Sequence, residues 1–295
     1  MMIPYDKRDG KIWYNASLVD WSDVKVHVLS HGLHYASCVF EGERVYDGEI
    51  FKLEEHTSRF FHSARRMGFE IPYTEEQINK ACKQIISVQN VENGYVRPVA
   101  WRGSEMMAIS AQQTKIHVAV ATWEWGSYFD PKLKLEGIKL NISKWKRPAP
   151  DTIPWDTKAS GLYMICTLSK HEAERDGYTD SLMLDHEGNV AEATGANVFF
   201  KDKDGILHTP IPDSFLDGIT RRAVINLAKK KGIKVIERKI DPEEMKNFVG
   251  CFLTGTAAEV TPVSQINDYK FKVCETITYL NEAYQNLVRK KDSAA

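Results

Sequence analysis

The sequence predicts an α+β fold that leans towards α/β and is divided into two domains. Short runs rich in β-branched and aromatic residues alternate with helical patterns in both halves, without the regular cadence of a doubly wound nucleotide-binding fold. A loosely patterned stretch with several glycines and prolines separates the halves. The length of 295 residues suits two apolar cores. We therefore expect a smaller α/β domain at residues 1–122, a linker at 123–135 and a larger domain at 136–295.

The first half is expected to open with strands. These are predicted where β-branched and aromatic residues run between turn residues, at 25–29, 39–46, 49–51, 95–101 and 116–122. Asp47-Gly48 is a strong hairpin signal, and Asn93-Gly94 predicts the turn into the next strand.

Two helices are expected in the same half. A helical pattern over residues 54–67 ends before Gly68, which is a typical helix stop. Thr74 and Gln77 form a capping box, which predicts the start of a helix that runs to about residue 89.

The second half continues with one strand between residues 123 and 150 and then a helix over residues 162–175, stopped by Gly177. Further strands are expected at 181–185, 197–201 and 250–253, with a turn at 187–189. An amphipathic helix over residues 218–231 ends at Gly232, and Asp241-Pro242 predicts the start of another.

Composition excludes several classes of protein. A formal net charge of −1 provides no basic field for nucleic acid or anionic lipid, so any bound anion requires a local site. The five cysteines are scattered, which argues against a disulfide framework or a cysteine zinc site. No secretory signal and no apolar run long enough for a membrane span is evident, so a cytoplasmic protein is expected.

The common nucleotide, zinc-protease and hydrolase motifs are absent. His31 and His34 have the spacing of a metal pair, but no nearby carboxylate or cysteine completes a ligand set. We interpret them as structural histidines in a turn and predict no metal site.

Two segments of the second half suit the binding of an anion through backbone N–H groups. Residues 216–221 place Gly218 and Thr220 at a helix start, and residues 254–259 form a tight turn of small residues after an apolar strand. Arg59 is available as a charged partner. Either segment alone is more often an ordinary cap or turn, so together they leave a phosphate site and a purely structural role equally open.

Lys158 precedes a predicted helix and has small residues beside it, which leaves room for a bulky group. Schiff-base chemistry needs a partly desolvated lysine, whereas most lysines are solvated. The residues around Lys158 permit this chemistry without identifying it.

Together these segments resemble the fold-type IV pyridoxal-phosphate (PLP) enzymes, and within them the branched-chain amino acid aminotransferases. The resemblance covers nearly the whole chain and rests on the order and spacing of residues 30–35, 39–44, 56–59, 95–98, 125–128, 158–163, 191–197, 216–221 and 254–259.

This resemblance implies that Lys158 binds PLP covalently and then acts as the base that moves a proton of the substrate. Glu192 would keep the pyridine nitrogen protonated, Tyr163 would bind the ring hydroxyl, and Leu216 would pack on the ring. The phosphate would be held by Arg59, Ile219, Thr220 and Thr256.

For the substrate, the resemblance implies an apolar pocket and an anion site. The pocket would be formed by Tyr35 of the partner subunit with Phe40, Trp125, Tyr128 and Tyr163. The carboxylates of the amino acid and of 2-oxoglutarate would be received by Arg44, Tyr95, Arg97, Thr256, Ala257 and Ala258. A homodimer or a ring of dimers follows, because the pocket uses both subunits.

The implied reaction converts leucine, isoleucine or valine and 2-oxoglutarate into branched 2-oxo acids and L-glutamate. Two departures from the family pattern bear on the substrate. Glu43 stands where the family usually has an apolar residue, and it would either pair with Arg44 and weaken its grip on an anionic substrate or be a solvated strand residue. Residues 102–107 differ from a small glycine-rich loop, which indicates either a changed pocket entrance or ordinary loop variation. Alternatives on the same fold are a D-amino acid or (R)-amine aminotransferase, an aminodeoxychorismate lyase, and a ligand-binding relative without catalysis.

Overall fold

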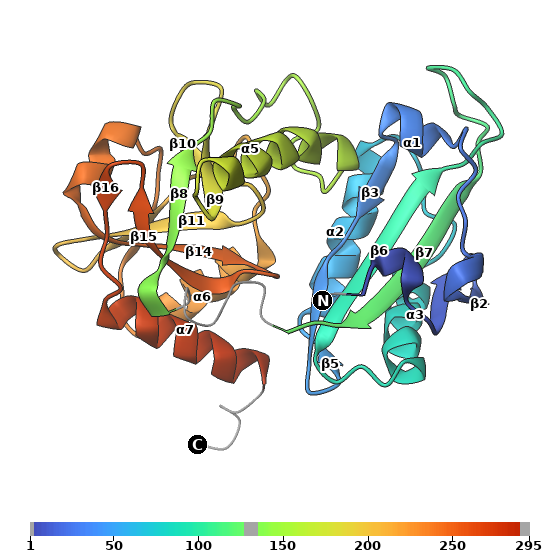
Figure 1. Ribbon diagram of the computed structural model, residues 1–295, viewed down its shortest axis with the longest axis horizontal. Coiled ribbons are helices and arrows are strands. Elements are labelled where there is room, and N and C mark those ends of the chain that lie inside the picture. Colours follow the sequence, from blue (N-terminus) through green and yellow to red (C-terminus); the bar gives the residue numbers. More distant parts are fainter. Residues whose placement is uncertain (1–2, 127–134, 290–295) are drawn as a thin grey trace. The chain divides into compact units, whose positions relative to one another are not determined.

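The computed structural model describes residues 3–126 and 135–289, which fold as two compact units (Figure 1). The first unit comprises Met1–Gly126 and Thr157–Leu162, and the second comprises Ser127–Asp156 and Tyr163–Ala295. Each unit combines a sheet with helices, so the α+β prediction is confirmed. Within the described ranges, no helix has the length and apolarity needed to cross a membrane.

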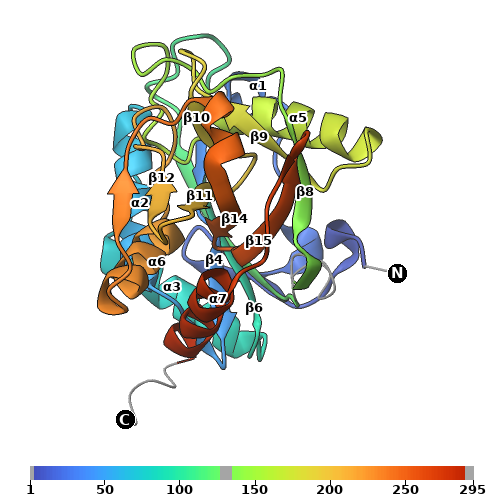
Figure 2. The ribbon, with the colours of Figure 1, turned by 90° about the vertical axis from the view of Figure 1, so that its left-hand side faces the viewer.

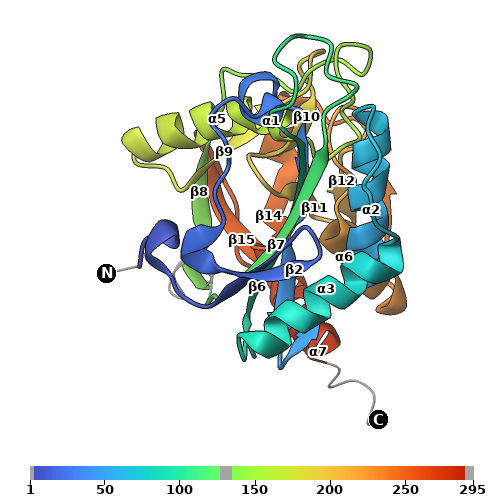
Figure 3. The same ribbon diagram turned by 90° about the vertical axis from the view of Figure 1, so that its right-hand side faces the viewer.

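The described residues of the first unit form a seven-stranded antiparallel sheet in the order β2-β1-β7-β6-β4-β5, with β3 paired to β6. The strands are β1 (Lys11–Tyr14), β2 (Ser17–Asp20), β3 (Cys38–Phe40), β4 (Glu43–Tyr46), β5 (Glu49–Ile50), β6 (Gly94–Arg102) and β7 (Ile116–Glu124). The helices are η1 (Tyr5–Lys7), η2 (Trp21–Asp23), α1 (His31–Tyr35), α2 (Leu53–Arg66) and α3 (Glu75–Val88). Helices α2 and α3 pack against each other and against the sheet (Figure 3).

Local chemistry explains these boundaries. Asp47 and Gly48 both have positive φ angles, 50° and 79°, which matches the hairpin turn that joins β4 to β5. Thr74 accepts a hydrogen bond from the Gln77 N–H, and the Gln77 side chain accepts one from the Thr74 N–H, so the predicted capping box of α3 is confirmed. Gly68, at φ 73°, follows the end of α2 as predicted.

Two predicted strands of the first half are wrong or incomplete. Residues 25–29 lie outside helix and strand, and Val26 and Val28 are 51% and 67% exposed, so the alternation of apolar residues there faces no core. The strand expected at 39–46 is interrupted at Glu41 and Gly42, which separate β3 from β4. The interruption allows β3 to pair with one end of β6 and β4 with the other.

The described residues of the second unit form a nine-stranded mixed sheet in the order β10-β9-β8-β15-β14-β11-β12-β13, with β16 paired to β15. The strands are β8 (Ile138–Ile142), β9 (Asp180–Leu184), β10 (Val190–Ala193), β11 (Asn197–Asp202), β12 (Leu207–Thr209), β13 (Val235–Glu237), β14 (Phe248–Gly255), β15 (Glu259–Ile266) and β16 (Tyr269–Lys270). Strand β8 pairs in parallel with β9 and β15, and β12 with β13.

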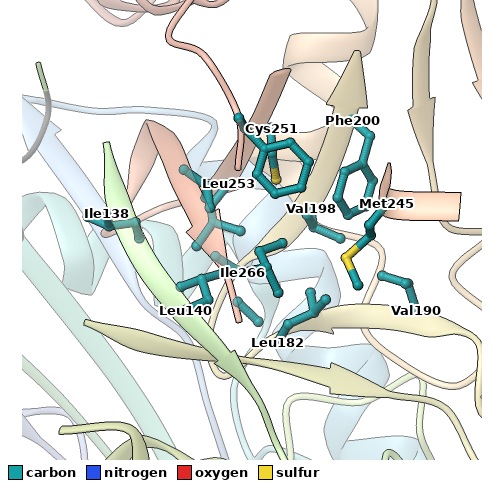
Figure 4. Close-up of a cluster of buried hydrophobic side chains, with 14 of the residues drawn as sticks. Ile138, Leu140, Leu182, Val190, Val198, Phe200, Met245, Cys251, Leu253 and Ile266 are labelled. Atoms are coloured by element: carbon teal, nitrogen blue, oxygen red, sulfur yellow. The ribbon is translucent and has the colours of Figure 1, made fainter. Parts of the chain in front are cut away.

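The helices of this unit are η3 (Ser160–Tyr163), which begins in the first unit, α5 (Met164–Arg175), α6 (Ile219–Lys230), η4 (Pro242–Asn247) and α7 (Glu275–Val288). Helices α6 and α7 pack together, against β14 and β15 respectively (Figure 2). A cluster of fully buried side chains, which includes Leu140, Val198 and Leu253, forms the core of the unit (Figure 4). Most residues of β9, β10, β14 and β15 are buried, which is typical of strands covered on both faces.

The predicted domain division differs from these units at Lys158. The larger domain was expected to contain it, whereas Thr157–Leu162 packs with the first unit. Ala159 forms a bridge with Val39, the Lys158 carbonyl accepts a bond of 3.1 Å from the Phe40 N–H, and the Lys158 N–H donates to Ser63 Oγ at 3.0 Å. Of the predicted linker, residues 123–124 belong to β7 and residues 127–134 lie outside the described residues.

Candidate active site

The surroundings of Lys158, in the first unit, suit the chemistry of a neutral amine. Its Nζ lies 5.1 Å from the centroid of the Phe40 ring. Burial is the main cause that lowers the pKa of Lys158, and the cations Arg59 and Arg97 act in the same direction, while the Glu41 carboxylate opposes them. A lowered pKa makes the neutral, nucleophilic amine easier to reach near pH 7.

A buried charged cluster lies beside Lys158. Helix α2 projects His56 and Arg59 from one face, three residues apart, towards Glu41, whose side chain is fully buried. Arg59 donates from Nε and Nη2 to the two carboxylate oxygens at 2.7 and 2.9 Å, and His56 Nδ1 donates at 2.7 Å. Burial alone would raise the pKa of Glu41, but Arg59 and His56 hold it well below its usual range. The guanidinium of Arg59 is thus fixed by an ionised carboxylate.

Two further arginines of this unit lie among aromatic rings. Arg97 donates to the Tyr95 hydroxyl at 3.4 Å and has its guanidinium carbon 4.7 Å from the centroid of the Phe40 ring. Arg44 donates to the Gly126 carbonyl at 2.8 Å and lies over the Trp125 ring at 5.7 Å. The Nε atoms of Arg44 and Arg97 are buried and have no hydrogen-bond partner within the described residues. Buried donors of this kind favour an anionic ligand.

The expected pairing of Glu43 with Arg44 is wrong. Successive residues of a strand point to opposite faces, so the two side chains of β4 diverge, and Arg44 bonds to Gly126 instead. Both carboxyl oxygens of Glu43 are buried without a hydrogen-bond partner in the part of the chain that is described. Burial, together with the nearby Glu41 and Glu54 carboxylates, raises the pKa of Glu43 well above its usual value. Burial therefore favours the neutral acid form of Glu43.

In the second unit, Glu192 of β10 is held on two sides. Arg147 Nε lies 3.6 Å from Glu192 Oε1, and Asn197 Nδ2 donates to Glu192 Oε2 at 3.3 Å. The same amide of Asn197 donates to the Leu216 carbonyl at 3.0 Å. Glu192 keeps 11% of its side chain exposed, so it is available to a ligand.

Both predicted anion-binding turns adjoin this region of the second unit. Gly218 caps α6 without a side-chain hydrogen bond, which leaves the first N–H groups of the helix for a ligand. A Cβ on Gly218 would lie 2.2 Å from Asn197 Oδ1, and one on Gly255 would lie 3.3 Å from the Gly195 carbonyl oxygen. The turns before α6 and between β14 and β15 thus flank one short segment, residues 195–197. The buried Thr254 hydroxyl, at the end of β14, has no partner in the described structure.

Comparison with known proteins identifies the family. The family model described as Amino-transferase class IV matches residues 38–266. The chain belongs to this family. It is 40% identical over 292 residues to a "Probable branched-chain-amino-acid aminotransferase" of Rickettsia conorii, covering 98% of this chain and 99% of the relative.

Solved structures of branched-chain aminotransferases agree with this assignment. The enzyme from the archaeon Thermoproteus uzoniensis with norvaline has a TM-score of 0.92 at 33% identity and covers 97% of this chain and 97% of its own. The Escherichia coli branched-chain amino acid aminotransferase has a TM-score of 0.92 at 35% identity, with a coverage of 96% of both chains.

Most residues predicted for the aminotransferase site fall into two groups. The first unit brings together Lys158, Arg59, Phe40, Arg44, Tyr95, Arg97 and Trp125. The second unit supplies Glu192, Leu216, Ile219, Thr220, Thr256, Ala257 and Ala258. Tyr163 ends η3, and Tyr35 lies 42% exposed on α1, stacked on His31. Tyr128 lies outside the described residues.

Four polar residues of this aminotransferase went unassigned in the sequence: Glu41, His56, Arg147 and Asn197. Glu41, His56 and Asn197 lie within the motifs that carry the family resemblance, so a signal for them was present. Arg147 lies in the irregular segment after β8, where no periodicity marks it, and only its burial identifies it.

Proposed function

We propose that the chain is a PLP-dependent aminotransferase that moves the amino group of leucine, isoleucine or valine to 2-oxoglutarate. The observation that carries this proposal is Lys158, a lysine with a lowered pKa beside a buried Glu41–Arg59 pair, in a chain of the class IV family. The relatives named above act on branched-chain amino acids according to their names, which supports the choice of substrate.

The residues present fit PLP. An amine with a lowered pKa suits attachment of an aldehyde, and a nearly buried carboxylate beside Arg147 suits a protonated ring nitrogen. The start of α6, which has no side-chain cap, and the Thr254 hydroxyl, which has no hydrogen-bond partner among the described residues, suit a phosphate region. When bound, PLP supplies the aldehyde and a ring that accepts the electron pair left at the substrate α-carbon.

We assign the cofactor contacts as follows. Lys158 Nζ would hold the cofactor and would act as the base towards the proton of the substrate α-carbon. Glu192 would receive the ring N–H, Tyr163 would bind the ring hydroxyl and Leu216 would pack on the ring. The phosphate is bound by Arg59, Ile219, Thr220 and Thr256.

The substrate contacts follow from charge and shape. Phe40 and Trp125, with Tyr35 of the partner subunit, Tyr128 and Tyr163, surround the apolar side chain. Arg44 and Arg97, whose buried Nε atoms lack partners within the described residues, receive carboxylates together with Tyr95, Thr256, Ala257 and Ala258. The aromatic rings accept the branched side chain in one half-reaction. The two cationic groups accept both carboxylates of 2-oxoglutarate in the other.

A homodimer, or a ring of dimers, belongs to this proposal. Large apolar side chains are exposed on two segments of the first unit, among them Val28 (67%), Leu33 (67%) and Ile109 (83%). His31 Nε2 bonds to the Ala108 carbonyl at 2.9 Å, which ties the two segments together. An exposed apolar patch of this kind is typical of a protein interface. Light scattering at micromolar concentration should give at least a dimer, and a monomer would contradict the assignment of Tyr35.

Lys158→Ala tests the proposal most directly. The variant should lose transamination by a factor on the order of 10⁴ or more, because the covalent attachment and the base are both removed. It should also lose the visible band of bound PLP. Lys144→Ala, which removes a lysine whose side chain is 63% exposed, is the control and should change neither. Borohydride reduction and peptide mapping must place the cofactor on Lys158, and a tag elsewhere would overturn the proposal.

The substrate is tested separately with wild-type protein. L-leucine, D-alanine and (R)-1-phenylethylamine are each assayed against 2-oxoglutarate and pyruvate. We expect L-leucine with 2-oxoglutarate to react at least about 100-fold faster than the other pairs, since an unmatched carboxylate or side chain costs several kcal/mol. Preference for D-alanine or the amine would reject the branched-chain assignment and leave the cofactor assignment intact.

A further inference from the structure

Arg147 is a buried arginine to which the proposed function gives no direct contact with cofactor or substrate. It is 4% exposed and lies in the irregular segment after β8. Its backbone N–H donates to the Leu184 carbonyl at 2.7 Å, which fixes the segment against the end of β9. An arginine loses much hydration on burial, so its position requires compensating partners.

The contacts of the Arg147 side chain include three groups of the same unit. Its Nη1 donates to Cys166 Sγ at 3.5 Å, its Nε reaches the Ser214 carbonyl at 3.5 Å, and Nε lies 3.6 Å from Glu192 Oε1. Burial raises the pKa of Cys166 to about 11, so this thiol is uncharged near pH 7. Glu192 is therefore the anion among these three partners.

One neutral donor and one cationic donor of the same unit contact the Glu192 carboxylate. Asn197 Nδ2 donates to its second oxygen, Oε2, at 3.3 Å. The nearby Asp180 accepts a bond of 2.6 Å from the Thr194 hydroxyl and has the ammonium of Lys170 at 3.9 Å. A cation thus lies close to each of these two carboxylates, Lys170 to Asp180 and Arg147 to Glu192.

We infer that Arg147 is a positioning residue that keeps Glu192 ionised and correctly oriented to receive the ring N–H of PLP. This inference rests on the proposed function and deepens it, because it names the group that maintains the carboxylate. Without the guanidinium, burial would favour the neutral acid, which does not hold a proton on the ring nitrogen. Arg147 touches neither substrate nor cofactor in this account, so its effect passes through Glu192 alone.

The test uses the PLP-loaded enzyme and two substitutions of Arg147. Arg147→Met removes the charge and keeps most of the volume, and Arg147→Lys keeps the charge. We expect Arg147→Met to lower kcat about 10-fold, with KM for L-leucine within about twofold. Arg147→Lys should recover part of the loss. If Arg147→Met does not fold, the comparison of Arg147→Lys with wild type carries the test.

A spectroscopic measurement separates this role from a merely structural one. The pH midpoint of the visible absorbance change of the bound cofactor should rise in Arg147→Met, because a ring nitrogen that has lost its proton withdraws less electron density from the rest of the cofactor. A residue that only braces Cys166 and Ser214 would lower thermal stability and leave this midpoint unchanged. That second result would overturn the inference.

A double-mutant cycle provides the remaining check. In a Glu192→Gln background, Arg147→Met should cause no further loss of kcat, since the carboxylate it supports is already gone. Independent losses that add would contradict the inference. Arg238→Met is the control, because it removes another arginine–glutamate pair of the same unit, with Glu244 at 2.6 Å, and should change neither kcat nor the midpoint.

Failure of the inference is distinguishable from failure of the proposed function. If wild-type protein shows no visible band with PLP, or if the band survives Lys158→Ala, the proposed function fails. If the band depends on Lys158 while the midpoint and kcat are indifferent to Arg147, only the role of Arg147 is wrong.

Discussion

The two units support their functional charges in opposite ways. In the first unit, a buried carboxylate, Glu41, holds Arg59, which we propose as a phosphate ligand. In the second unit, a buried arginine, Arg147, faces Glu192, which we propose as the partner of the ring nitrogen. The supporting group is an anion in the first unit and a cation in the second, and the group proposed to contact the cofactor has the opposite charge in each. The common rule is that a charge is desolvated next to a built-in counter-charge, because an unpaired buried charge costs several kcal/mol.

The first unit also contains an exception to this rule. Glu43 is as deeply buried as Glu41, only two residues away, but neither of its oxygens has a partner within the described residues. The two pKa values move in opposite directions, Glu41 downward and Glu43 upward. The contrast shows that the arginine, more than the burial, decides which carboxylate is ionised.

The largest expected effect comes from Glu41→Gln. The substitution removes the counter-charge of Arg59 with little change of shape, so we expect the free energy of unfolding at pH 7 to fall by about 3 kcal/mol. Because the folded pKa of Glu41 is lowered, its contribution is present above the unfolded pKa of about 4.3 and is lost on acidification below it. The variant should therefore lose less stability than wild type between pH 5 and 3. Urea denaturation at several pH values measures both effects.

Glu55→Gln is the matched control for this substitution. Glu55 pairs with Lys52 at the start of α2, with 41% of its side chain exposed, so its loss should cost less than about 1 kcal/mol. Equal losses for Glu41→Gln and Glu55→Gln would break the comparison, because the buried pair would then contribute no more than a surface pair.

The sequence predicts the elements whose signals are local. The capping box at Thr74, the Asp47-Gly48 turn and the glycine stops at Gly68 and Gly177 fix their elements through bonds within a few residues. The strand expected at 25–29 failed because an alternating pattern does not reveal whether a partner strand exists. Strand β15 and helix α7 were not predicted. Besides its neighbour β14, β15 pairs with the distant β8, and α7 packs against the distant α6.

The site shows the same division. Family motifs place Lys158, Arg59 and Glu192, but the partners of these residues come from long-range contacts. Glu41 meets Arg59 across 18 residues, and Arg147 meets Glu192 across 45 positions of chain that include α5 and β9. The predicted Glu43–Arg44 pair failed for a local reason, since neighbours in a strand face opposite ways.

Gly218→Ala is expected to have an intermediate effect and sharpens the comparison in the second unit. A Cβ there would lie 2.2 Å from Asn197 Oδ1, so Asn197 must rotate away from Glu192 and the Leu216 carbonyl. We expect a loss of about 2 kcal/mol in unfolding free energy and a PLP dissociation constant raised about 10-fold. Gly195→Ala is the stability control, because nothing lies within 4 Å of its added Cβ. An unchanged stability of Gly218→Ala would show that Asn197 is not a fixed brace.

Glu43→Leu should produce the smallest effect, and it should stabilise the protein. Of Glu41 and Glu43, it removes the carboxyl group that has no hydrogen-bonded counter-charge among the described residues. The folded pKa of Glu43 is raised, so between the unfolded pKa and the folded pKa the unfolded chain has lost a proton that the folded chain keeps. Wild-type stability therefore falls as pH rises through this window. Leucine abolishes that loss. The unfolding free energy of Glu43→Leu should therefore exceed that of wild type by a margin that grows by about 1 kcal/mol from pH 5 to pH 8, as measured by urea denaturation. Glu43→Gln keeps an unpartnered polar group and should reproduce only the pH-dependent part. If Glu43→Leu instead destabilises the protein equally at both pH values, Glu43 has an ionic partner when folded, and the distinction between it and Glu41 disappears.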